Sequence, residues 1–184
     1  MKQDLHSKPF DETTKAKLAI FNDYLIEWLP VFTKRKDIIW KIINIYDFFA
    51  GPGFDSEGNK GTPILILNEL KNHFDAIEQN RLEVNLYFNE FDESKNTDLK
   101  KNVLDNDGFL PYNVRIEKLD FKLAFDKEFS KMAQQGQANL IFLDQYGIKH
   151  ITTDIFKKII NLKQTDFLFF ISSSTIKRLS LIRL

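Results

Sequence analysis

The sequence predicts a doubly wound α/β fold, in which helices connect the strands of an open parallel sheet. Five apolar runs alternate along the chain with segments of helical periodicity. Runs such as Leu140–Leu143 and Phe167–Ile171 are apolar at every position, as expected of strands buried on both faces. The first run, Ile42–Phe48, leads through a glycine-containing turn into a helix start, which is the beginning of a right-handed βαβ unit.

A helix is expected before the first strand. From Thr14 onwards, large apolar residues recur at intervals of three, four and three, so that they share one face of a helix. These residues are Leu18, Phe21, Leu25 and Trp28. Pro30 is expected to end this helix, because proline has no backbone N–H to donate.

The remaining elements follow in alternation. The predicted strands are Ile42–Phe48, Val84–Phe88, Asn113–Leu119, Asn139–Leu143 and Asp166–Ile171. Four helices are expected between them: one from Thr62 to about Ile77, one capped by Ser94, one carrying Phe125, Phe129 and Met132 and ended by Gly136, and one capped by Thr152 or Thr153.

The turn after the first strand has the features of a ligand cradle. Gly51 and Gly53 can take positive φ and lack a Cβ, so a ligand can approach their backbone closely. After a seven-residue segment, Gly61-Thr62-Pro63 supplies a helix start, with Thr62 as the expected cap. This arrangement predicts a nucleotide-like ligand. The intervening segment disfavours a nicotinamide-dependent oxidoreductase, in which the turn runs directly into the helix.

Several motifs resemble those of one family. They are Asp47-Phe-Phe-Ala-Gly-Pro-Gly53 with Gly61-Thr-Pro63, Tyr87-Phe-Asn-Glu90, Phe142-Leu-Asp-Gln-Tyr-Gly147 and Ser172-Ser-Ser-Thr-Ile-Lys-Arg178. Together they resemble the three-Cys-motif partner family, whose members are similar to class I S-adenosylmethionine-dependent methyltransferases. The resemblance implies a Rossmann-like sheet with strand order 3-2-1-4-5, S-adenosylmethionine as cofactor, and a partner protein with three cysteines encoded nearby. Residues 1–40 would form an N-terminal helical segment and residues 41–184 the methyltransferase domain, within a single domain overall.

Four acids follow successive predicted strands, at the edge where open α/β sheets bind ligands: Asp47, Glu90, Asp120 and Asp144. An acid in the first motif would accept hydrogen bonds from the ammonium end of S-adenosylmethionine. An acid after the second strand would bind the ribose diol, and an acid after the third strand would bind the adenine amino group. An aromatic side chain nearby would stack on the adenine ring. The expected cofactor-binding residues are therefore Asp47, Phe49, Gly51, Gly53, Glu90, Phe91, Asp120 and Phe121.

The loop Leu143–Gly147 occupies the position of the catalytic loop. It resembles Asp-Pro-Tyr-Gly in the family, which is itself similar to the Asp-Pro-Pro-Tyr loop of enzymes that methylate amino groups in nucleic acid. The resemblance makes Asp144 and Tyr146 the catalytic residues, which would position the acceptor amine. Gln145 replaces the first proline of that pattern. The excess of Lys and Arg in residues 145–184 is compatible with a nucleic-acid acceptor.

Composition excludes several other classes of protein. The chain has no Cys, hence no disulfide and no thiolate metal site, and His6, His73 and His150 lack metal-ligand spacing. No metal is therefore expected. The sequence has no stretch of about 18 apolar residues, the length that a membrane-spanning helix needs, and the polar start Met1–His6 does not resemble a signal peptide. Cytoplasmic localisation is the resulting expectation.

A second function stays open beside the enzyme. The class I methyltransferase fold normally adds two strands after the fifth, whereas this sequence ends soon after it. Together with Gln145, this favours a non-catalytic, truncated methyltransferase-fold module that docks a cysteine-rich partner protein. The intact glycine turn and Glu90 favour the methyltransferase.

Overall fold

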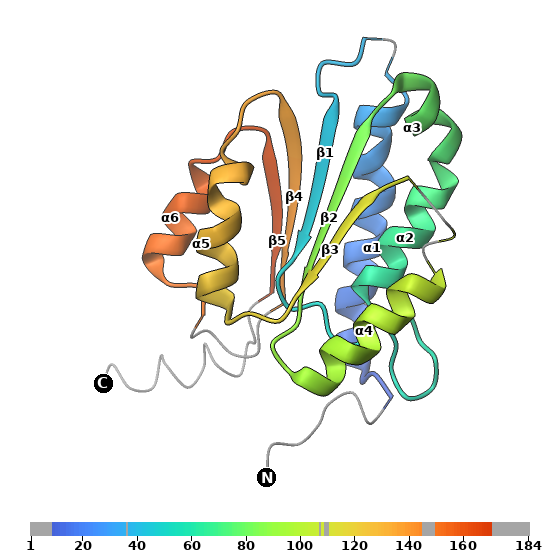
Figure 1. Cartoon of the computed structure of the whole chain (residues 1–184), viewed down its shortest axis with the longest axis vertical. Coiled ribbons are helices and arrows are strands. Elements are labelled where there is room, and N and C mark those ends of the chain that lie inside the picture. Colours follow the sequence, from blue (N-terminus) through green and yellow to red (C-terminus); the bar gives the residue numbers. More distant parts are fainter. Residues whose placement is uncertain (1–8, 36, 107, 109–110, 145–149, 171–184) are drawn as a thin grey trace.

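The computed structural model describes residues 9–35, 37–106, 108, 111–144 and 150–170. Within them the chain forms one sheet of five parallel strands in the order β3-β2-β1-β4-β5 (Figure 1). The strands are β1 (Ile42–Asp47), β2 (Glu83–Asn89), β3 (Asn113–Glu117), β4 (Gln137–Leu143) and β5 (Thr165–Phe169). This confirms the predicted α/β fold and the strand order that the resemblance implies.

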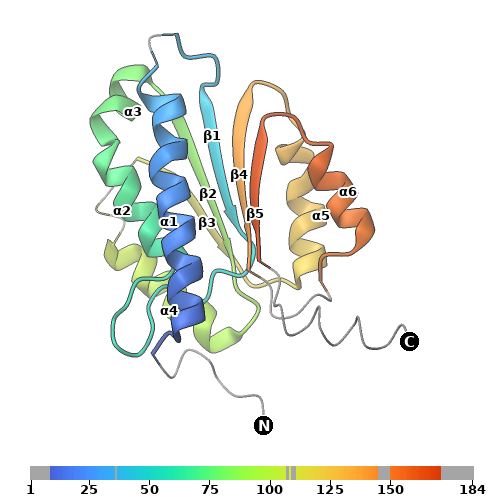
Figure 2. The ribbon, with the colours of Figure 1, turned by 180° about the vertical axis from the view of Figure 1, so that it is seen from behind.

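Helices cover both faces of the sheet (Figures 1 and 2). One face is covered by α1 (Glu12–Thr33), α2 (Thr62–Asn72), α3 (Phe74–Asn80) and α4 (Glu93–Asn106). The other is covered by α5 (Phe121–Met132) and α6 (Thr153–Ile160), which share a core with side chains of β1, β2, β4 and β5. Because all five strands are parallel, their carboxyl ends meet at one edge of the sheet, where the predicted ligand site should lie.

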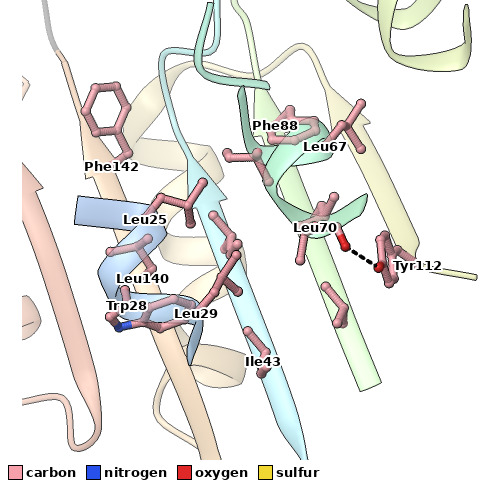
Figure 3. Packing of buried hydrophobic residues seen from close by; sticks show 14 of the residues in the cluster. Leu25, Trp28, Leu29, Ile43, Leu67, Leu70, Phe88, Tyr112, Leu140 and Phe142 are labelled. Atoms are coloured by element: carbon pink, nitrogen blue, oxygen red, sulfur yellow. Dashed lines mark hydrogen bonds between the residues drawn. The ribbon is translucent and has the colours of Figure 1, made fainter. Parts of the chain in front are cut away.

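The larger core lies between the sheet and the first group of helices. Figure 3 shows Leu25 and Leu29 of α1 and Leu67 and Leu70 of α2 packed against side chains of β1, β2 and β4. Two polar groups in this layer are bonded at its borders: the Tyr112 hydroxyl donates to the Leu70 carbonyl at 3.1 Å, and Trp28 Nε1 donates to Asp166 Oδ2 at 2.8 Å. Because α1 shares this core with the strands, the N-terminal helical segment is an integral part of the fold.

A ladder of amide side chains crosses the sheet at one register position. Asn113, Asn85, Asn44, Asn139 and Thr165 lie opposite one another on the five strands. Each Asn Nδ2 donates to the side-chain oxygen of the next strand, at 2.9, 3.0, 2.9 and 3.0 Å in that order. A shift of any inner strand by one residue would leave these groups unpaired, so the ladder fixes the register.

Three local predictions were wrong. Pro30 lies inside α1, where the Lys34 N–H still donates to its carbonyl at 3.0 Å; buried Leu29 and Phe32 hold this last turn against the core. The helix predicted from Thr62 to Ile77 breaks at His73, whose buried ring bonds to Thr33 of α1 at 2.8 Å. Finally, α5 ends at Met132, before the predicted terminator Gly136.

Helix capping was predicted correctly at α6 and wrongly at α2 and α4. Ser94, the predicted cap of α4, is the second residue of that helix, and Asp92 Oδ1 accepts from the Lys95 N–H at 3.1 Å instead. Thr152 caps α6, with its hydroxyl accepting from the Ile155 N–H at 3.4 Å. At α2, by contrast, Gly61 is the N-cap and Thr62 is the first helical residue. The Thr62 side chain is therefore free for another role, which lies in the candidate site.

Candidate functional site

The glycine turn at the end of β1 has the predicted conformation. Gly51 and Gly53 have φ of 64° and 92°, in the left-handed region that favours glycine. The turn closes against the start of α2, because the Gly61 N–H donates to the Gly53 carbonyl at 2.7 Å. A Cβ at Gly61 would lie 3.1 Å from that carbonyl oxygen. The backbone is thus packed too closely here to accommodate a side chain.

Asp47 holds this turn from inside the protein. Its side chain is 0% exposed, with Oδ1 accepting from the Phe49 N–H at 3.1 Å and Oδ2 accepting from the Thr62 hydroxyl. Burial raises the pKa of Asp47 to about 7, and the charges of Asp144 and Glu90 add to the effect. Asp47 therefore joins the end of β1 to the start of α2 and lies beneath the surface that a ligand would touch.

Glu90 reaches the glycine turn from the neighbouring strand. Its Oε2 accepts from the Gly51 N–H at 3.0 Å, and its Oε1 accepts from the Asp92 N–H at 2.8 Å. The side chain is half-buried, and each carboxylate oxygen has a second lone pair for a further donor. The structure therefore brings together Glu90 and the glycine turn, as the sequence prediction requires.

The predicted aromatic residues differ in their exposure. Phe49 stacks on Phe121, with ring centroids 5.0 Å apart and an interplanar angle of 23°. Phe121 belongs to the core beneath α5, while Phe91 is 67% exposed. The ring of His150, which the sequence did not indicate, lies 5.6 Å from that of Phe49. Phe121 supports Phe49 from the core, which leaves Phe49 and Phe91 as the rings nearest the solvent.

Asp120 stands at the start of α5. It is exposed and caps the helix, because its Oδ1 accepts from the Lys122 N–H at 2.9 Å. Its carboxylate thus stabilises the amino-terminal end of α5, as the side chain of an N-cap residue normally does. It follows β3, as the sequence predicted.

Asp144 directly follows β4 and is paired with a cation from α1. Lys17 Nζ lies 2.7 Å from Oδ1 and 2.6 Å from Oδ2 of Asp144, and the two side chains are 25% and 23% exposed. The amino-terminal end of α1, which carries Lys17, extends past the carboxyl ends of the strands (Figure 2). Gln145 and Tyr146 lie outside the described residues.

The sequence contains a signal for the role of Lys17 that lies outside the motifs. Lys17 precedes Phe21 by four residues, so it lies on the same helix face as the buried residues Phe21 and Leu25. A cation on a core-facing stripe requires an acid opposite it, since unpaired charges are rarely buried. The identity of that acid is not evident from the sequence, because Asp144 is 127 residues away.

The site is an acidic edge with a close-packed backbone turn. Asp47, Glu90 and Asp144 lie near enough for their charges to interact, and Lys17 neutralises Asp144. Among the described residues, no group of three or more His, Asp or Glu side chains could hold a metal ion. In the same part of the chain, no helix is both long and apolar enough to cross a membrane. The carboxylates of this edge favour a cationic ligand.

Comparison of the sequence with protein-family models and with curated proteins found no match. The resemblance to the three-Cys-motif partner family therefore stays a prediction from motifs.

Proposed function

We propose that this protein is an S-adenosylmethionine-dependent methyltransferase of the three-Cys-motif partner type. The observation that best supports the proposal is the bond between Glu90 and the Gly51 N–H. It joins the turn after β1 to the end of β2, beside the point where the strand order reverses between β1 and β4. Open α/β sheets bind their ligands at such a point.

The chain's own groups fit the cofactor. The glycine turn would lie against its amino-acid end, and the free lone pairs of Glu90 would accept from the two ribose hydroxyls. Phe49 and Phe91 offer ring surfaces for adenine. S-Adenosylmethionine carries a positive sulfonium and an ammonium group, which the carboxylates of this edge would attract. Asp47 would keep the turn in shape from below.

On the acceptor side, Asp144 is the proposed positioning group, together with Tyr146. When bound, the cofactor supplies a methyl group activated by its sulfonium. The chain's contribution would be to hold the acceptor nitrogen in line with that methyl group. Because Lys17 engages both oxygens of Asp144, the acceptor must share this carboxylate or displace the lysine. The acceptor and the cysteine-rich partner remain proposals, with nucleic acid as the first acceptor class to examine.

A specific observation favours the second function, a non-catalytic module that docks a cysteine-rich partner. The Lys17–Asp144 pair occupies the carboxylate that would position an acceptor. If the pair is permanent, it stabilises α1 against β4 and has no catalytic role.

A methyl-transfer assay distinguishes the two functions. Purified protein would be incubated with methyl-labelled S-adenosylmethionine, the three-cysteine partner and mixed RNA and DNA acceptors. We expect transfer that Asp144→Asn abolishes, while Asp154→Asn, a control on α6, leaves it unchanged. Binding of cofactor without transfer, combined with partner binding that Asp144→Asn does not alter, would support the docking module instead.

A further inference from the structure

A hollow lies between the amino-terminal half of α1 and the segment that joins β1 to α2. Its volume is about 470 Å³, within the range of small-molecule sites. The lining side chains of α1 are spaced at intervals of three and four, so they share one face of the helix. These residues are Lys15, Leu18, Ala19 and Asn22, and the rest of the lining is formed by Phe10, Gly58, Asn59, Lys60 and Leu65.

Asp55 holds the two walls of this hollow together. Its side chain is buried, and its carboxylate accepts from the Phe10 N–H at 2.7 Å on one wall and from the Asn59 N–H at 2.8 Å on the other. It also accepts from Asn59 Nδ2 at 2.7 Å and from the Glu57 N–H at 2.9 Å. The segment before α1 and the loop before α2 are therefore joined by the protein's own bonds, as expected of a largely pre-formed site.

Part of the lining is apolar. Leu18 and Leu65 are half-buried, and Leu65 packs against the larger core. Phe10 is buried, and Ala19 is exposed on α1. The hollow thus presents apolar carbon at the border of the core, and covering such carbon with an apolar ligand is favourable because it is removed from water.

The charged part of the lining is basic. Lys15 and Lys60 contribute two positive charges, and none of the described residues that line the hollow is an acid. Glu12, which is not part of the lining, lies 3.1 Å from Lys15 Nζ, but the two side chains are 92% and 48% exposed. An ion pair this exposed is weak, so Lys15 can also bind a ligand. The amides of Asn22 and Asn59 add hydrogen-bonding groups to the lining.

We propose that this hollow binds a small amphiphilic anion, in which a carboxylate or phosphate head is attached to an apolar body. Lys15 and Lys60 would hold the head through charge-assisted hydrogen bonds. Leu18 and Leu65 would contact the apolar body, whose burial would supply much of the affinity. The inference does not depend on the proposed methyltransferase activity, because none of the lining residues belongs to the proposed cofactor or acceptor site.

The test uses calorimetry on the whole protein with four probes: octanoate, octyl phosphate, octylamine and acetate. Octanoate or octyl phosphate should bind with a Kd below about 1 mM, because each combines an anionic head with an apolar body. Octylamine has the opposite charge and should bind at least about tenfold more weakly, and acetate, which lacks the apolar body, should not bind measurably. Tighter binding of octanoate would identify the head as a carboxylate, and tighter binding of octyl phosphate would identify it as a phosphate.

Two matched pairs of variants locate the binding. Lys60→Gln should weaken binding of the anions by about threefold or more, whereas Lys157→Gln, at an exposed lysine of α6, should leave it unchanged. Ala19→Asp should weaken binding more than Ala19→Asn, because the two side chains have the same size and only the aspartate repels an anion. Position 19 is exposed on α1, so both of its variants should fold, which circular dichroism would verify.

Three results would overturn the proposal. The first is that neither octyl anion binds to the folded wild type. The second is that octylamine or acetate binds as tightly as the anions, which would show that the head or the body is not recognised. The third is that Lys60→Gln and Lys157→Gln change the affinity equally. If Lys60→Gln does not fold, equal affinities of Ala19→Asp and Ala19→Asn overturn the proposal instead.

Discussion

Asp47 should make the stability of the protein depend on pH in an unusual direction. Its pKa is raised from 3.8 to about 7 in the folded state, where it is fully buried beneath the glycine turn. Between these two values the folded protein holds a proton that the unfolded chain releases. The free energy of unfolding therefore falls as the pH rises from about 4 to about 7, and the stability gained by protonation is complete below 4. Each pH unit corresponds to about 1.4 kcal/mol, so the total is about 4 kcal/mol at most.

The assay is urea unfolding of the wild type and of Asp47→Asn at intervals between pH 4.5 and 7.5. The variant keeps the size of the side chain and cannot ionise, so its stability relative to the wild type should rise steadily across this interval. Asp55→Asn serves as a control of opposite sign. Hydrogen bonds from Asn59 and from the Phe10 N–H lower the pKa of Asp55 to about 2, so its effect should appear only below about pH 4. A constant difference between wild type and Asp47→Asn from pH 4.5 to 7.5 would refute the reasoning.

Two further predictions concern stability. Asn139→Leu should lower the free energy of unfolding by about 2–3 kcal/mol, because Asn139 is fully buried and bonds to β1, β5 and the Met132 carbonyl. Asn113→Ala, at the exposed end of the ladder, should lower it by less than about 1 kcal/mol. Equal losses of the two variants in urea unfolding would contradict the role of the ladder. A double-mutant cycle with Lys17→Met and Asp144→Asn should give a coupling energy of about 1–2 kcal/mol, since the pair is half-buried and Lys17 bonds to both carboxylate oxygens. A coupling energy near zero would show that the pair does not hold α1 to β4.

The general fold was predictable because its signals are local. Continuous apolar runs and helical stripes recur in strict alternation, and each strand formed within a few residues of its predicted place. The errors arose where tertiary packing outweighs local preference. Pro30 is tolerated in a helix because buried neighbours hold the last turn, and His73 breaks a helix because it bonds to α1. Neither effect is visible in a short window of sequence.

The candidate site was predictable only in part. The motif located Gly51, Gly53 and Glu90 correctly at one edge, because strand ends of a parallel sheet meet there. The burial of Asp47 and its bond to Thr62 depend on how α2 closes over the turn. The pairing of Asp144 with a lysine of α1 depends on the complete fold. The asparagine ladder likewise becomes apparent only once the register of all five strands is known.

Calorimetry tests most directly whether the glycine turn and Glu90 form an S-adenosylmethionine site. The wild type and Glu78→Gln, an exposed control on α3, should bind S-adenosylmethionine with equal affinity. Glu90→Gln should bind it at least tenfold more weakly, because one charged acceptor for the ribose hydroxyls is lost. Circular dichroism would verify that both variants fold. Absence of binding to the folded wild type, or equal affinity in Glu90→Gln, would contradict the account.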